Sequence, residues 1–204
     1  MTDELQAPNH HAHYPGFAGW FGLVAALSMA TGRGGDAQLA AQLSGVGRDD
    51  VVVDIGCGPG EAARHAARLG ARVTGVDPAA MMLRVARVLG VLTRRVRFVK
   101  GRAEALPLPD DFATVVWAIA TVHHWPDLER AVKETLRVLR DGGRFVAMER
   151  LTTPHAQGLE SHGWTRAQAE AFADMCREHG FTNVEVDEHK TDRRNVVSVV
   201  ARAG

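Results

Sequence analysis

The stretch Val51-Val52-Val53-Asp54-Ile55-Gly56-Cys57-Gly58-Pro59-Gly60 decides the fold. Residues 51–55 form a largely apolar run, as expected for a strand buried on both faces of a parallel sheet. The glycines let the backbone bend sharply and pass close to a ligand, because a side chain would block the approach. Ligands of open α/β sheets bind at the carboxyl ends of strands. The stretch therefore predicts a buried strand that ends at a ligand site.

Strand and helix patterns alternate after this stretch. Helices are predicted at 61–69, 79–89, 128–139 and 165–179. Further strands are predicted at 72–76, 96–100, 113–119, 144–148, 181–188 and 195–201. Asp141-Gly142-Gly143 is expected to close the third helix with a left-handed turn. The alternation predicts an α/β fold: a Rossmann-like, doubly wound, mostly parallel seven-stranded sheet with an antiparallel hairpin strand at its carboxyl-terminal edge.

The segment before residue 46 has a different character. Residues 1–15 are polar and contain three histidines, whereas 16–44 holds two apolar, helical pieces broken by a glycine-rich run. We expect residues 1–45 to form an N-terminal arm and a helical lid or acceptor segment, and 46–204 to form the main domain. A homodimer face is a second interpretation of the early segment.

Composition narrows the classes of function. Of the 204 residues, 24 are Lys or Arg and 24 are Asp or Glu, so the positive surplus that drives nucleic-acid binding is absent from the sequence. The two cysteines match neither a disulfide framework nor a metal-ligand pair, which favours the reducing cytoplasm. The apolar run 17–30 is interrupted by glycines and too short to span a bilayer, so membrane insertion is not expected.

Two carboxylates flank the glycine turn in sequence. Asp54 precedes the turn and can accept hydrogen bonds from an ammonium group or from backbone amides. Asp77 ends the second strand, where an acidic residue typically binds both hydroxyls of a ribose. A nicotinamide dinucleotide would use the same features, but its turn reads G-x-G-x-x-G. Here Pro59 has no amide for a phosphate and Glu61 would repel pyrophosphate, so a nucleoside without phosphates fits better.

Residues 53–60 resemble motif I of the class I S-adenosylmethionine-dependent methyltransferases. Four later strings are similar to the family's subsequent motifs in order and spacing: Gly75-Val76-Asp77-Pro78, Met81-Met82-Leu83, residues 101–107, and residues 121–127 with 137–143. The resemblance covers about half the chain, from 48 to 150. It is strongest to the small-molecule group that includes menaquinone, ubiquinone, sterol and sugar methyltransferases.

The resemblance implies S-adenosylmethionine as cofactor, S-adenosylhomocysteine as product, and a role for each matching position. The methionine end would lie at the glycine turn and the ribose at the end of the second strand. The adenine would lie between that strand end and the 101–107 segment. The implied cofactor-binding residues are Asp54, Gly56, Cys57, Gly58, Asp77, Pro78, Met81, Ala103, Glu104 and Ala118. Cys57 has no base beside it in sequence and is interpreted as a small packing residue, not a nucleophile.

A methyl group on a sulfonium is already activated, so the enzyme must align an acceptor and, for a hydroxyl, remove a proton. His123 and His124 follow the fourth predicted strand and are the candidate bases. Adjacent residues of extended chain point to opposite sides, so only one of the two is expected to act, with His123 preferred. A divalent metal held by these histidines is a disfavoured alternative, and no metal ligand is assigned.

Aromatic and polar residues are candidates for an acceptor pocket, because aromatic faces stack on sugars and flat rings. They are Tyr14, Phe17, Trp20, Phe21, Trp125, Glu149 and His155, with Arg150 and His162 as weaker candidates. The expected activity is O-methylation of a sugar, phenol or quinol. The alternatives are C- or N-methylation of another metabolite, a non-catalytic protein that binds S-adenosylmethionine, and a nicotinamide-dependent oxidoreductase.

Overall fold

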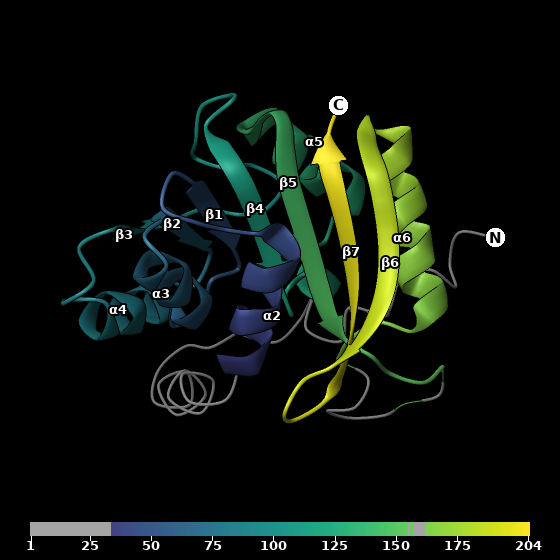
Figure 1. Ribbon diagram of the computed structural model, residues 1–204, viewed down its shortest axis with the longest axis horizontal. Helices are drawn as coiled ribbons and strands as arrows, with labels where there is room; N and C mark the ends of the chain where they lie inside the picture. Colours follow the sequence, from purple (N-terminus) through teal and green to yellow (C-terminus); the bar gives the residue numbers. More distant parts are fainter. Residues whose placement is uncertain (1–33, 155, 157–161) are drawn as a thin grey trace.

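The computed structural model describes residues 34–154, 156 and 162–204 (Figure 1). The helices are α2 (Gly34–Ser44), α3 (Glu61–Arg68), α4 (Ala80–Leu89), α5 (Leu128–Val138) and α6 (Arg166–Glu178), with a short 3-10 helix η1 (Val122–His124). The strands are β1 (Val51–Ile55), β2 (Arg72–Asp77), β3 (Val96–Lys100), β4 (Ala113–Ile119), β5 (Leu139–Arg150), β6 (Phe181–Lys190) and β7 (Asn195–Ala203).

In the described chain these seven strands form one sheet in the order β3-β2-β1-β4-β5-β7-β6. Strands β1 to β5 pair in parallel, whereas β7 runs antiparallel to both β5 and β6. The predicted doubly wound sheet with a carboxyl-terminal hairpin is therefore confirmed. The strand order reverses between β1 and β4, so the glycine turn after β1 lies at the point where such sheets bind ligands.

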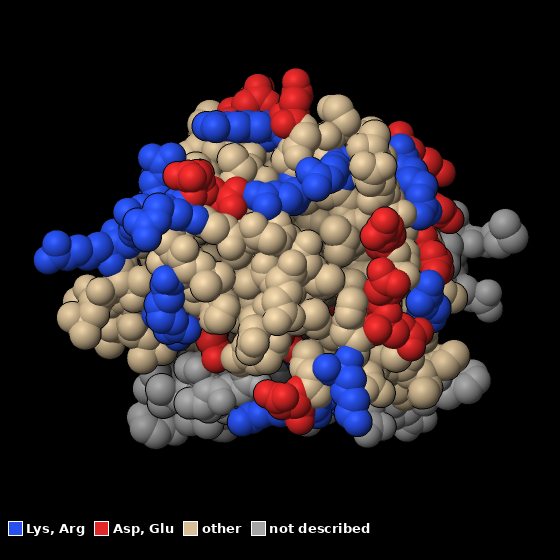
Figure 2. All heavy atoms as spheres, viewed as in Figure 1, with Lys and Arg blue, Asp and Glu red and all other residues tan. Residues whose placement is uncertain are grey.

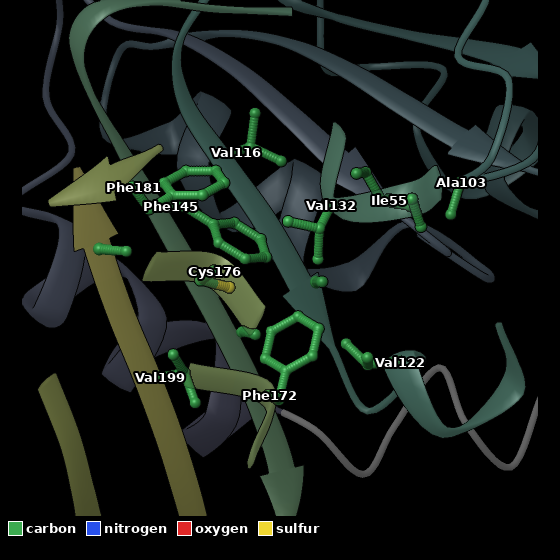
Figure 3. Packing of buried hydrophobic residues seen from close by; sticks show 14 of the residues in the cluster. Ile55, Ala103, Val116, Val122, Val132, Phe145, Phe172, Cys176, Phe181 and Val199 are labelled. Atoms are coloured by element: carbon green, nitrogen blue, oxygen red, sulfur yellow. The ribbon is translucent and has the colours of Figure 1, made fainter. Parts of the chain in front are cut away.

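Alternating side chains of the central strands belong to two hydrophobic layers, one on each face of the sheet. Val52 packs with α2, α3 and α4 residues on one face of the sheet, and Val53 packs with α5 and α6 residues on the other. Figure 1 shows α2 in front of the sheet and α5 behind it. In the second layer the rings of Phe145 and Phe181 lie 5.5 Å apart, beside Cys176 (Figure 3). The buried strand predicted from the apolar run 51–55 is thus covered on both faces.

The connection from α5 to β5 differs from the prediction. Helix α5 ends at Val138, and Leu139 is already extended and pairs with Ala113. Residues 140–143 then bulge out before Arg144 pairs with Val115. Gly142 does adopt the left-handed region, with a φ of 69°, but within this bulge of β5 and not as the closing residue of a helix.

Helix α2, from the predicted N-terminal segment, packs into the main domain. Ala40 and Ala41 belong to the same buried cluster as Val52. Ser44 accepts a hydrogen bond from Trp117 Nε1 at 3.1 Å, and Arg144 donates to the Ser44 carbonyl at 2.6 Å. The predicted boundary between 45 and 46 therefore falls inside one packed unit.

Candidate cofactor and active site

The glycine turn is shaped by left-handed backbone and by a close neighbour. Gly56, Gly58 and Gly60 have φ values of 68°, 52° and 78°, a region that non-glycine residues seldom adopt. A Cβ on Gly56 would lie 2.0 Å from Thr121 Oγ1, whereas a Cβ on Gly58 would meet nothing within 4 Å. The turn therefore lies against the loop after β4 at Gly56 and leaves open space at Gly58.

Asp77 holds this turn and the start of α4 together. Its Oδ2 accepts a hydrogen bond from the Gly58 N–H at 2.9 Å, and its Oδ1 accepts one from the Ala79 N–H at 2.8 Å. Burial raises the pKa of Asp77, and the two amide hydrogen bonds partly oppose that rise. A carboxylate can accept about four hydrogen bonds, so each oxygen still has capacity for a ribose hydroxyl.

The other polar groups at the turn are also buried. Asp54, near the end of β1, is 2% exposed and pairs in register with Gly75 and Trp117. Burial raises the pKa of Cys57 well above its usual 9.0, and the charges of Asp54 and Asp77 raise it further. The thiol is consequently protonated at neutral pH and has little nucleophilic character.

The part of the site assigned to adenine by the resemblance contains one buried oxygen without a hydrogen-bond partner among the described residues. This oxygen is Glu104 Oε1, although the Glu104 carboxylate lies 3.8 Å from Arg102 Nε. A buried acceptor of this kind suits an amino group of a bound base. Nearby in sequence, Ala103 is buried, Pro78 is exposed and Met81 is half-buried. The donors and acceptors present thus fit a nucleoside.

Arg137, which the sequence analysis did not single out, fixes the segment that carries Glu104. It donates to the carbonyls of Leu106 and Leu108 at 3.2 and 2.9 Å and forms ion pairs with Asp110 and Glu134. Glu134 also accepts the Leu106 N–H at 2.8 Å. An arginine one turn after a glutamate is common on helices. The spacing alone therefore does not predict the contacts of Arg137 with the carbonyls of Leu106 and Leu108.

His123 and Glu149 form a hydrogen-bonded pair at the carboxyl ends of β4 and β5. His123 Nδ1 lies 2.8 Å from Glu149 Oε2, and the His123 backbone N–H donates to Glu149 Oε1 at 3.3 Å. Burial raises the pKa of Glu149, but the charge of His123 and these hydrogen bonds outweigh burial and hold it below its usual value. Ionised Glu149 can only accept, so His123 donates from Nδ1 in either protonation state, and in the neutral ring the lone pair is on Nε2.

Comparison with known proteins finds methyltransferase relatives. Residues 53–147 match a family model described as a methyltransferase domain. The chain is 35% identical, over 79% of its length and 58% of the relative, to 27-O-demethylrifamycin SV methyltransferase of Amycolatopsis mediterranei (strain S699). It carries a class I S-adenosylmethionine-dependent methyltransferase domain.

Two further likenesses place this methyltransferase domain among known proteins. It is 40% identical, over 48% of the chain and 41% of the relative, to the ubiquinone/menaquinone biosynthesis C-methyltransferase UbiE of Methylobacterium nodulans. A solved methyltransferase in complex with the Haloferax volcanii Trm112 methyltransferase activator superposes with a TM-score of 0.80. That alignment covers 92% of this chain and 97% of the solved one at 22% identity, so it supports the fold alone. The chain spans only about half the length of the two curated relatives.

The structure differs from the prediction in the placement of several residues of the proposed site. His123 and His124 lie in the 3-10 helix η1, not in extended chain, so the argument that they must point apart was wrong. Their ring centroids are 3.9 Å apart, and the His162 ring lies 5.8 Å from that of His123. Glu149, predicted to line the acceptor pocket, is fully buried behind His123. Trp125 belongs to a hydrophobic core cluster with 9% exposure.

The remaining predicted positions lie in the core of the sheet or outside the described residues. Ala118 is buried in β4, paired with Ile55 and Ala147. Tyr14, Phe17, Trp20, Phe21 and His155 lie outside the described residues. Within the described ranges, no group of three or more His, Cys, Asp or Glu residues is placed to hold a metal ion. In those ranges, too, every helix is too short or too polar to cross a bilayer.

Proposed function

We propose that this protein transfers a methyl group from S-adenosylmethionine to a hydroxyl oxygen of a small-molecule acceptor. The observation that carries the proposal is the pair of His123 and Glu149, which lies next to the loop that contacts the glycine turn. The name of the rifamycin-type relative agrees with a hydroxylated metabolite as acceptor.

Each cofactor-side residue has a proposed role that follows from its position. Asp54, Gly56 and Gly58 would meet the methionine end, and Cys57 would contribute backbone there. Asp77 would accept the ribose hydroxyls. Glu104 would accept the adenine amino group beside Pro78, Met81 and Ala103, while Ala118 would lie beneath the cofactor. When bound, the cofactor supplies an electrophilic methyl group.

His123 would act as the base. Its Nε2 lone pair would accept the hydroxyl proton as the acceptor oxygen takes the methyl group that the bound cofactor would supply. Glu149 is a positioning residue: it fixes the tautomer of the ring and stabilises the imidazolium that forms. A base of this kind contributes about 10²- to 10⁴-fold to the rate.

A carbon acceptor is the second candidate, favoured by the C-methyltransferase relative. Methylation of a carbon can also require loss of a proton, so the same base would serve either reaction. The atom that receives an isotopically labelled methyl group distinguishes the two candidates. A homodimer, a cytoplasmic location and a lid formed by the part of residues 1–45 that precedes α2 stay predictions.

The test has two stages. Calorimetry should detect binding of S-adenosylmethionine and S-adenosylhomocysteine, but not of NAD. A screen of hydroxylated sugars, phenols and quinols with labelled methyl donor then identifies the acceptor. The variant His123→Ala should lose about 10²-fold or more in kcat while its affinity for S-adenosylhomocysteine stays within about twofold of the wild type. Full activity of this variant would exclude His123 as the base, and NAD binding would refute the cofactor assignment.

A further inference from the structure

A hollow lies at the opposite end of the sheet from the glycine turn. It has a volume of about 540 Å³ and begins where β1, β2 and β3 begin, at Val51, Arg72 and Val96. A strand of five residues is about 17 Å long, so this hollow is separate from the cofactor site. We propose that it binds a small phosphorylated organic molecule. This inference is independent of the function proposed above.

The hollow is lined by positively charged side chains. The lining residues include five arginines and no carboxylate; the arginines are Arg72, Arg94, Arg95, Arg97 and Arg140. In the part of the chain that the structure describes, none of the five forms an ion pair. Asp50, the sequence neighbour of Val51, is instead bound by Arg144 and Thr114. The chain as a whole carries equal numbers of basic and acidic residues, so the lining of the hollow is more positively charged than the chain as a whole.

Two of the arginines are held in place without using their outer nitrogens. Arg97 Nε donates to Thr74 Oγ1 at 2.8 Å, and its guanidinium lies 5.3 Å from the centre of the Phe112 ring. Arg140, in the bulge of β5, donates from Nε to the Asp111 carbonyl at 2.9 Å. In both, the Nη nitrogens can still donate to an anion. Anchored guanidinium groups bind phosphate in a bidentate manner and lose little freedom on binding.

The remaining lining residues explain why an organic phosphate is favoured over inorganic phosphate. Val51, Val73, Val96 and Phe112 give the hollow an apolar and aromatic wall. Its volume lies within the range of about 300–1,000 Å³ found for small-molecule sites. The connection between β3 and β4, residues 101–112, contains no helix, and its last residue, Phe112, lines the hollow. On the face drawn in Figure 2, basic side chains also gather beside β2 and β3.

Calorimetry with uridine diphosphate and with inorganic pyrophosphate, each at about 150 mM salt, tests the proposal. Neither probe contains adenosine, so binding is not confused with the cofactor site. We expect uridine diphosphate to bind with a Kd below about 1 mM and more tightly than pyrophosphate. The double variant Arg97→Gln/Arg140→Gln should weaken uridine diphosphate about tenfold or more, because two charge-assisted contacts are lost.

Three further variants make the result specific. Arg94→Gln/Arg95→Gln changes only the exposed turn before β3, so it should fold normally and still weaken binding severalfold. Arg97→Lys keeps the charge but loses the planar fork of donors, so it should bind uridine diphosphate more weakly than wild type and more tightly than the double variant. Arg193→Gln removes one exposed arginine outside the hollow and should change affinity less than about twofold.

Four results would overturn the proposal. The first is no binding of uridine diphosphate at millimolar concentration. The second is equal loss of affinity in Arg193→Gln and in the hollow variants, which would indicate general attraction to the surface. The third is equal affinity for pyrophosphate and uridine diphosphate. The fourth is preferential binding of a duplex DNA of about 20 base pairs. Either of these two results would remove the role of the apolar wall.

Discussion

Nδ1 of His123 lies 2.8 Å from Oε2 of Glu149, whose side chain has no exposed surface. The two residues come from different segments, one after β4 and the other at the end of β5, and meet at the edge of the sheet where the cofactor is proposed to bind. A buried carboxylate behind a half-buried histidine is an arrangement suited to proton abstraction.

The variant Glu149→Gln should lower kcat by about 10²-fold or more, because an amide can donate to Nδ1 and move the ring proton to Nε2. The affinity for S-adenosylhomocysteine should change less than about twofold. Glu149→Asp keeps an acceptor-only group and should recover part of the loss. Steady-state kinetics with the identified acceptor give the measurement, and a Glu149→Gln enzyme that differs from wild type only in KM would contradict the positioning role.

Stability should depend on pH through the same pair. The folded-state pKa of Glu149 lies below its ordinary value of 4.5, so the ionised carboxylate stabilises the fold above about pH 4.5. This contribution is lost as the pH falls through the folded-state pKa. Urea unfolding between pH 3 and 7 should therefore give a free energy of unfolding that drops below about pH 4.5. Glu149→Gln should flatten that drop, and an identical pH dependence in the variant would count against the pair.

Asp77→Ala should weaken S-adenosylhomocysteine by about 10²-fold, since two charge-assisted hydrogen bonds to the ribose would be lost. Asp77→Asn keeps one acceptor oxygen and should lose less. Because Asp77 also binds the N–H groups of Gly58 and Ala79, part of the loss comes from a loosened turn. Thermal unfolding without ligand measures that part separately. Unchanged affinity in Asp77→Ala would refute the ribose assignment.

Gly56→Ala and Gly58→Ala form a matched pair. Both positions have positive φ, so each alanine should cost about 1–2 kcal/mol of backbone strain. Only Gly56→Ala also places a Cβ against Thr121, which should cost about 1–3 kcal/mol more. Denaturant unfolding of the two variants measures the difference. Equal destabilisation would mean that the loop after β4 does not contact the turn in solution.

Much of the fold could be predicted because its signals are local. The apolar run at 51–55 predicts a buried strand, and the glycines after it predict a sharp turn. The acidic end of β2 predicts a carboxylate at the ligand site. The bulge at 140–143 could not be predicted, because helix α5 passes directly into β5 where a glycine-closed end was the ordinary expectation.

The site was predicted less completely, because it depends on contacts between distant segments. Glu149 was recognised as a candidate, but its partner His123 is 26 residues away and only the sheet brings them together. The orientation of His123 and His124 was misjudged because η1 replaces extended chain. Arg137 lies in the matching string 137–143, but its role could not be predicted, because its carbonyl partners Leu108 and Leu106 are 29 and 31 residues away in the sequence.

The packing of α2 into the sheet has a consequence for how this protein can be divided. Residues 53–147, which match the family model, contain neither α2 nor α6, β6 and β7. Strand β7 pairs with β5, and α6 packs in the same cluster as Phe145. A fragment cut at those limits would leave Trp117 and Phe145 facing water on opposite sides of the sheet. Truncation experiments that aim for a minimal catalytic unit should therefore begin no later than Gly34 and continue through Ala203.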